Sequence, residues 1–270
     1  MRRRGKPSSG RRAGPEPAAA GARPPGGRVP QDLGRTLGDA AAALGLTLPA
    51  AFPAQIETYL AELERWQRIG SLTAYRDRAT RVRHLVVESL MLLAAVPEPA
   101  SPLLDIGTGP GVPGLILKLA RPEWEVVLIE AAQRRTNFLR HVVRQLGLGG
   151  VTVLWGRAEA LASAAQAGRF RTVTMRAVAA GEAARALAAP FLAPEGTLVL
   201  PLGPMSPPGG GTRREITLAA RGELPWRRQF LIIPRTELSA GVPRGTRRAT
   251  GSVHRSREPE GRRREDHDSR

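Results

Sequence analysis

Apolar residues recur at helical spacing in the first third of the chain, which predicts a helical region. In three stretches between residues 31 and 96, apolar positions return every three or four residues. The recurring positions are Leu33, Leu37, Ala40, Leu44, then Phe52, Ile56, Leu60, Leu63, then Val82, Leu85, Leu90, Leu93. Three prolines, Pro97, Pro99 and Pro102, follow and end helical structure. The pattern predicts a small helical cap over residues 31–100.

From residue 103 onward, short apolar runs alternate with helix-like segments. Strands are expected at 103–106, 126–130, 151–155, 171–175, 197–200 and 230–233, with a further one near 214–219. Helices are expected at 113–121, 132–146, 157–166 and 181–190. Strands that alternate with helices pair in a mostly parallel sheet that carries helices on both faces. We therefore expect a Rossmann-like α/β domain over residues 101–235.

Both ends of the chain are poor in large apolar residues and rich in arginine. Residues 1–30 and 236–270 cannot bury enough surface to offset the entropy of ordering, so we expect disordered basic tails there. A glycine- and proline-rich loop is expected at 202–212.

Charge is unevenly distributed along the chain. The net charge of the whole chain is +17, and residues 1–30 alone hold +7. Such a balance favours a nucleic-acid partner. A solvated basic surface is the alternative, because Lys6 and Lys118 are the only lysines and the arginine excess fits the codon bias of a GC-rich genome.

Other classes of protein are disfavoured by what the composition lacks. The chain has no cysteine and only four scattered histidines, so neither a disulfide framework nor a metal site is expected. No apolar run approaches the roughly 18 residues of a membrane span, and the basic N-terminus has no apolar segment typical of a secretion signal. We expect a cytoplasmic, monomeric protein that binds neither metal nor membrane.

Residues 103–114, Leu-Leu-Asp-Ile-Gly-Thr-Gly-Pro-Gly-Val-Pro-Gly, carry the clearest chemical signal. An apolar strand containing Asp105 leads into a turn with Gly107, Gly109 and Gly111, and a helix follows. Glycine lets the backbone turn tightly and approach a ligand, and the helix N-terminus favours negative groups. The next strand ends in Glu130, whose carboxylate can accept hydrogen bonds from two ribose hydroxyls.

Three interpretations of this motif stay open at this point. Gly-x-Gly-x-Gly preceded by Asp is typical of S-adenosylmethionine-dependent methyltransferases. Dinucleotide-dependent enzymes such as reductases prefer Gly-x-Gly-x-x-Gly. The glycines could also form a purely structural turn.

The motif and its surroundings resemble the glucose-inhibited division protein B family over roughly residues 38–234. Matching segments occur in the family's order and spacing: Trp66 to Thr73, Arg76-Asp77, Val82-Arg83-His84, the glycine loop, Glu130 with Arg134-Arg135, Gly156 to Glu159, Arg176-Ala177, and Pro194 to Thr197. The resemblance implies a class I methyltransferase. Its substrate would be N7 of a guanine in 16S ribosomal RNA, either free or in a precursor of the small ribosomal subunit.

The resemblance also implies which residues form the site. S-adenosylmethionine would contact the glycine loop, the second strand and the turns after strands three and four, at Gly107, Gly109, Gly111, Val112, Glu130, Ala158, Glu159 and Arg176. Arg176 is additionally expected to act in catalysis. Guanine N7 carries a lone pair and no proton, so the reaction needs positioning rather than a base or a metal.

Each of these side chains also has a structural alternative. Glu130 and Glu159 could be favourable charges at helix N-termini, and Arg176 could be an ion-pair partner. Asp105 is expected to bind loop amides rather than ligand. His84 is expected to be a buried residue of the cap.

The chain departs from the family pattern in three places within the matching region. Ser71 replaces an Asn, and the family's Lys after strand five is absent from Leu200-Pro201-Leu202-Gly203. The family's His-x-x-Asp-Ser is one residue longer here, with His84 followed by Glu88 and Ser89. The loss of the Lys leaves one alternative open, a non-catalytic module that binds S-adenosylmethionine and assists ribosome assembly.

Overall fold

A computed structural model describes residues 31–162, 166–176, 178–179, 181–203, 210–219 and 225–238. The chain divides into two units, residues 1–240 and 241–270, and every described residue belongs to the first. The expected tails over 1–30 and beyond 238, and most of the expected loop at 202–212, lie outside the described residues.

The helical segments predicted between residues 31 and 96 are confirmed. They are α1 (Gln31–Ala43), α2 (Phe52–Gln67) and a continuous rod made of α3 (Arg78–Arg81), the π-helical turn η1 (Val82–Val87) and α4 (Glu88–Ala95). Asp77 caps the rod, because its carboxylate accepts a hydrogen bond from the Thr80 amide at 2.8 Å. The rod ends at Val96, whose extended backbone leads into Pro97.

One seven-stranded sheet forms the centre of the molecule, in the order β3-β2-β1-β4-β5-β7-β6. The strands are β1 (Leu103–Ile106), β2 (Val126–Glu130), β3 (Val151–Trp155), β4 (Phe170–Met175), β5 (Leu192–Leu202), β6 (Thr212–Leu218) and β7 (Trp226–Pro234). Strands β1 to β5 pair in parallel, whereas β7 runs antiparallel to both of its neighbours. The expected mostly parallel α/β fold is confirmed.

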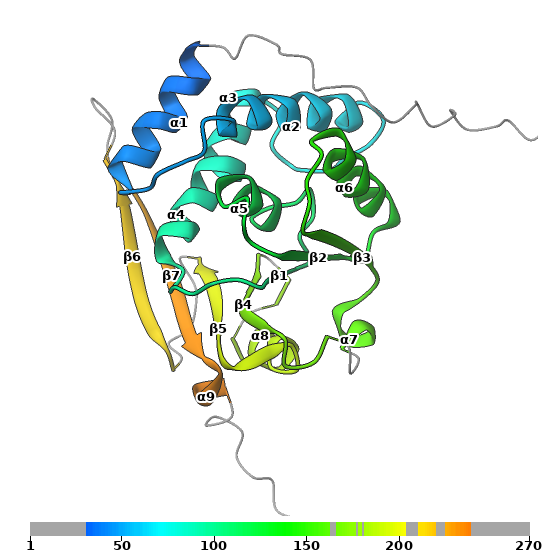
Figure 1. Cartoon of the computed structure of the whole chain (residues 1–270), viewed down its shortest axis with the longest axis vertical. Helices are drawn as coiled ribbons and strands as arrows, with labels where there is room; N and C mark the ends of the chain where they lie inside the picture. The colour runs from blue at the N-terminus through cyan, green and yellow to red at the C-terminus, as the bar shows by residue number, and fades with distance from the viewer. Residues whose placement is uncertain are drawn as a thin grey trace, which may run out of the picture. The chain divides into compact units, whose positions relative to one another are not determined.

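Helices cover both faces of the sheet because successive strand residues point to opposite sides (Figure 1). Leu103, Val126 and Leu128 belong to one buried cluster with α1, α2, η1, α4, α5 (Gly114–Ala120) and α6 (Gln133–Gln145). Leu104 and Val127 belong to the opposite cluster with α8 (Gly181–Ala188) and α9 (Arg235–Leu238). The N-terminal helices thus share one core with the sheet.

Three sequence expectations need correction at element boundaries. The helix expected over 157–166 is only α7 (Ala158–Leu161) within the described residues. Strand β5 is longer than expected because it first pairs with β4 at Leu192, and its pairing resumes at Thr197 after an irregularity in register. The disorder expected from 236 onward is wrong for residues 236–238, because α9 buries the Leu238 side chain in the core.

Candidate functional site

The carboxyl ends of four parallel strands bring the candidate residues to one edge of the sheet. Ile106, the last residue of β1, pairs with Ile129 on one side and with Met175 on the other. The chain order of the strands reverses between β1 and β4, which is where ligands bind in open α/β sheets. The glycine loop, Glu130, the start of α7 and Arg176 all follow these strand ends.

The glycine loop is held in shape from several sides. The amides of Gly107 and Thr108 donate to the Ile129 carbonyl, at 2.8 and 3.1 Å, and the Gly111 amide donates to the Thr108 carbonyl at 3.0 Å. From the cap, the buried Tyr59 hydroxyl of α2 donates to the Pro110 carbonyl at 3.1 Å. Hydrogen bonds from β2, from the loop itself and from α2 therefore hold the loop.

The three loop glycines have positive φ values but different surroundings. Gly109 has φ +59°, and a Cβ there would meet no atom within 4 Å, so open space lies beside the backbone. A Cβ on Gly107 would approach Val178 Cγ2 at 2.3 Å, and one on Gly111 would approach Leu115 Cβ at 2.9 Å. Gly109 is thus the glycine that leaves room for a ligand, whereas Gly107 and Gly111 pack against protein.

Asp105 binds the loop from beneath, as expected. Its Oδ2 accepts from the Thr108 hydroxyl at 2.6 Å and from the Gly114 amide at 2.8 Å, while its buried Oδ1 has no partner among the described residues. Burial raises the pKa of Asp105 to about 6, and these hydrogen bonds only partly oppose the rise.

Glu130 is buried, and its carboxylate is hydrogen-bonded both to the glycine loop and to the backbone that follows β2. Its Oε2 accepts from the Gly109 amide at 2.9 Å, and its Oε1 accepts from the Ala132 amide at 2.8 Å. Arg135 lies 3.9 Å from Oε1. A carboxylate offers about four acceptor positions, so two remain for ribose hydroxyls. The side chain thus fixes the backbone of the glycine loop at Gly109 relative to the end of β2.

The other proposed cofactor residues lie at the same edge with different exposures. Val112 is 2% exposed, and its side chain packs in the core. Ala158 is buried at the start of α7, and Glu159 next to it is exposed. The bordering Trp155, at the end of β3, is 53% exposed, and its indole nitrogen donates to the Ala131 carbonyl at 3.0 Å.

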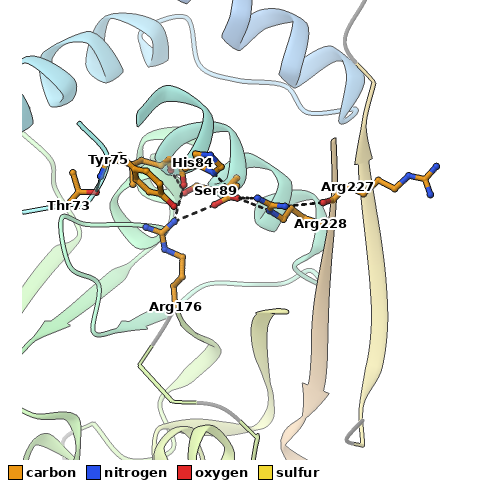
Figure 2. A network of polar contacts seen from close by, with 9 residues as sticks. Thr73, Tyr75, His84, Ser89, Arg176, Arg227 and Arg228 are labelled. Atoms are coloured by element: carbon orange, nitrogen blue, oxygen red, sulfur yellow. Dashed lines mark hydrogen bonds and ion pairs between the residues drawn. The ribbon is translucent and has the colours of Figure 1, made fainter. Parts of the chain in front are cut away.

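Arg176 extends from the end of β4 to the rod of the cap (Figure 2). Its guanidinium donates to the His84 carbonyl at 2.9 Å and lies 3.5 Å from Glu88 Oε2. From the other side, Arg228 of β7 donates to Glu88 Oε1 at 2.7 Å. His84 Nδ1 is 3.2 Å from the same oxygen. One carboxylate therefore joins three cationic or ionisable groups from three elements.

The segment expected to be one residue longer than the family pattern, from His84 to Glu88, overlaps a π-helical turn. A π-turn contains one more residue than an α-helical turn, so an insertion is absorbed without rotating the rest of the helix. The turn spans Val82–Val87, and His84 still meets Glu88. His84 is only partly buried, and its ring stacks on Tyr75 at a centroid distance of 4.8 Å.

Sequence reasoning missed Arg228 and Tyr59 as contributors to this region. Arg228 lies 140 residues after Glu88, and no local pattern connects them. Tyr59 follows the apolar spacing of α2 and is fully buried, so its hydroxyl contact with the glycine loop has no sequence signal.

The strand order, the glycine loop after β1 and the acid that ends β2 define a class I methyltransferase, the class that uses S-adenosylmethionine. A family model described as rRNA small subunit methyltransferase G (GidB) matches residues 53–206, and the chain belongs to this family.

Named relatives agree with this assignment. A ribosomal RNA small subunit methyltransferase G from Moorella thermoacetica is 44% identical over 43% of this chain, and the chain spans 48% of that relative's length. The protein of that name from Sorangium cellulosum is 40% identical over 59% of this chain and 67% of its own length.

Among solved structures, the chain is similar to a predicted O-methyltransferase from Agrobacterium tumefaciens. The two are 20% identical, and the match covers 54% of this chain and 79% of that chain with a TM-score of 0.43.

The site fits the cofactor of this class. Open space beside Gly109, two free acceptor positions on Glu130 and a row of strand carboxyl ends are what a nucleoside with a charged tail requires.

Among the described helices, none is long and apolar enough to cross a bilayer.

Proposed function

We propose that this chain methylates N7 of a guanine in 16S ribosomal RNA with S-adenosylmethionine as the methyl donor. The observation that carries the proposal is the cradle of Gly109 and Glu130 at the carboxyl edge of a sheet whose chain belongs to the methyltransferase G family. The named relatives act on small-subunit ribosomal RNA. The basic net charge of +17 supports a nucleic-acid substrate.

Residues of this chain would position both reactants. Glu130 would hold the ribose of the cofactor, the backbone at Gly109 would lie against it, and Ala158 and Glu159 would border the adenine. Bound S-adenosylmethionine supplies a methyl group already activated by sulfonium sulfur. Guanine N7 has no proton to lose, so the chain's task is to align the base and exclude water.

Arg176 is the candidate for that alignment. It leaves the end of β4 and stays protonated at neutral pH, so it cannot serve as a base. Its side chain is 28% exposed, and its guanidinium is already oriented by Glu88 and the His84 carbonyl. We propose that its remaining donors hold the target nucleotide or the carboxylate of the cofactor.

The two predicted regions of the chain would have different roles in this function. Residues 101–235 would bind the cofactor, and residues 31–100 would form the cap that holds the glycine loop through Tyr59 and receives Arg176. The tails would add RNA affinity. We further propose that the chain acts as a monomer in the cytoplasm.

Transfer of tritium from labelled S-adenosylmethionine tests the proposed function in vitro. We expect incorporation into small-subunit ribosomal RNA or its precursor particle, and little into large-subunit RNA at the same concentration. Retention of the cofactor without any transfer would favour the non-catalytic assembly module. Binding of a nicotinamide cofactor in its place would favour a reductase.

A further inference from the structure

A cavity lies outside the cofactor edge, between the end of α2, the following loop and α3. Its volume is about 530 Å³, and we call it the α2–α3 pocket. It is lined by Glu64, Gln67, Arg68, Ser71, Thr73, Ala74, Arg76, Arg78 and Arg81. Arginine is thus the commonest lining residue, and Glu64 is the only acid among them.

The wall of the α2–α3 pocket is fixed by the side chain of Gln67. Its Oε1 accepts from the amides of Leu72 and Thr73, at 2.7 and 3.2 Å, and its Nε2 donates to the Thr73 carbonyl at 2.8 Å. The loop therefore keeps its shape, and Ser71 and Thr73 both line the pocket.

Two arginines of the pocket are neutralised and oriented by acids. Arg81 is 5% exposed; its Nε donates to the Tyr75 carbonyl at 3.0 Å, and its Nη1 lies 3.4 Å from Glu64. Arg78 contacts Glu64 at 3.5 Å and also pairs with Glu57. These pairs leave little net charge at the back of the pocket.

The other two arginines, Arg68 and Arg76, supply the charge at the mouth. Both are exposed, and within the described part of the chain neither side chain forms a hydrogen bond or an ion pair. Asp77, beside Arg76, is engaged as the cap of α3 through the Thr80 amide. The α2–α3 pocket therefore presents two unneutralised guanidinium groups above a polar floor.

The pocket is adjacent to the contacts of Arg176. Tyr75 follows the lining residues Thr73 and Ala74, and its ring stacks on His84, whose carbonyl accepts from Arg176. Figure 2 shows Thr73, Tyr75 and His84 side by side, with Arg176 reaching toward them. A ligand that fills the pocket therefore lies one stacked pair of rings away from the residue proposed to align the base.

We propose that the α2–α3 pocket binds the phosphodiester backbone of the RNA substrate next to the target guanine. Guanidinium groups match phosphate oxygens in geometry and charge. Phosphate contacts set the register of a nucleic acid on a protein without reading its sequence. The inference rests on the proposed function, because it takes RNA as the substrate.

The test compares three double variants with the wild-type chain. The first, R68A/R76A, removes both mouth charges at exposed positions. The second, R68K/R76K, keeps the charge. The matched control, R140A/R144A, removes two exposed arginines from α6. Binding to a small-subunit ribosomal RNA transcript is measured over a series of salt concentrations, together with S-adenosylmethionine affinity.

We expect R68A/R76A to bind RNA at least about tenfold more weakly and to lower the salt slope by roughly 1.4–1.8, because two phosphate groups are no longer neutralised. R68K/R76K should keep the slope, and cofactor affinity should not change in any variant. An unchanged salt slope in R68A/R76A would contradict the proposal that the pocket binds phosphate groups. An equal loss of RNA affinity in R140A/R144A would contradict it as well. Methyl transfer, measured separately on the wild type, decides the proposed function, so the two failures are distinguishable.

Discussion

At the residue scale, Glu130 has an observed role and a proposed one. Its carboxylate accepts hydrogen bonds from the amides of Gly109 and Ala132, and we propose that its remaining acceptor positions bind a ribose. We expect Glu130→Ala to weaken S-adenosylmethionine binding about tenfold or more, because charge-assisted hydrogen bonds are lost. Isothermal calorimetry measures this. Glu159→Ala at the same edge is the comparison, and equal affinities of wild type and Glu130→Ala would leave Glu130 with a structural task only.

The raised pKa of Asp105 predicts that the free energy of unfolding depends on pH. Burial raises its pKa from 3.8 to about 6 in the folded chain, so the folded state binds more protons than the unfolded state between these values. Stability from this group is therefore greatest below pH 4 and falls by about 3 kcal/mol in total as the pH rises through the folded pKa of about 6.

Paired thermal unfolding curves of the wild type and Asp105→Asn, taken from about pH 4 to about pH 8, isolate this effect. Because all other groups are shared, the difference between the two melting temperatures should change from about pH 4 to about pH 7, through the folded pKa of about 6, and be flat above that range. A difference that stays constant over the whole range would contradict the raised pKa.

At the scale of elements, Glu88 connects β4, β7 and the helical rod. It meets Arg176, Arg228 and His84 at the start of α4. We expect Glu88→Gln to lower the single-turnover rate of methyl transfer while cofactor affinity is retained, because Arg176 loses its orienting charge. Arg176→Ala should lower the same rate further, and Arg176→Lys should restore it only in part, because a point charge does not reproduce a planar fork.

A double-mutant cycle of Glu88→Gln and Arg176→Ala distinguishes positioning from stability. If Glu88 acts through Arg176, the two effects on the rate are not additive, since the residues share one interaction. Additive losses of rate, or losses of melting temperature with a normal rate, would make this pair structural.

The element scale also shows what the sequence could and could not predict. Alternating apolar runs were sufficient for the parallel strands β1 to β4, because each run is short and bounded by turn residues. The antiparallel direction of β7 was not predictable from its apolar pattern, which is the same in either direction. The extra residue between His84 and Glu88 was visible, but its accommodation as a π-turn depends on the packing of the rod.

The site was predictable to a similar extent. Strand ends placed Glu130 and Arg176 at one edge, since carboxyl ends of parallel strands coincide there. The packing of Val178 against Gly107, and the approach of Arg228 to Glu88, involve residues distant along the chain. Such contacts have no local signature.

The uneven charge of the whole molecule leads to a prediction about the tails. Residues 1–30 and 239–270 together hold +11, and the remaining 208 residues hold +6. Removing both tails while keeping Leu238, which is buried, should leave cofactor affinity unchanged and weaken RNA binding. The salt slope should fall by roughly 0.7–0.9 for each phosphate group that the tails neutralise. RNA titrations at several salt concentrations measure this slope for the full chain and for the shortened chain. Equal slopes would mean that the tail arginines do not contact RNA.

The most direct test of the account is to map N7-methylguanosine in 16S ribosomal RNA from cells with and without this protein. Small-subunit RNA from cells that lack the protein is also treated in vitro with purified protein and S-adenosylmethionine. The account predicts one N7-methylated guanine that disappears with the protein and returns on treatment, but not with Arg176→Ala. Identical maps from both kinds of cell, with no N7 methylation gained in vitro, would contradict it.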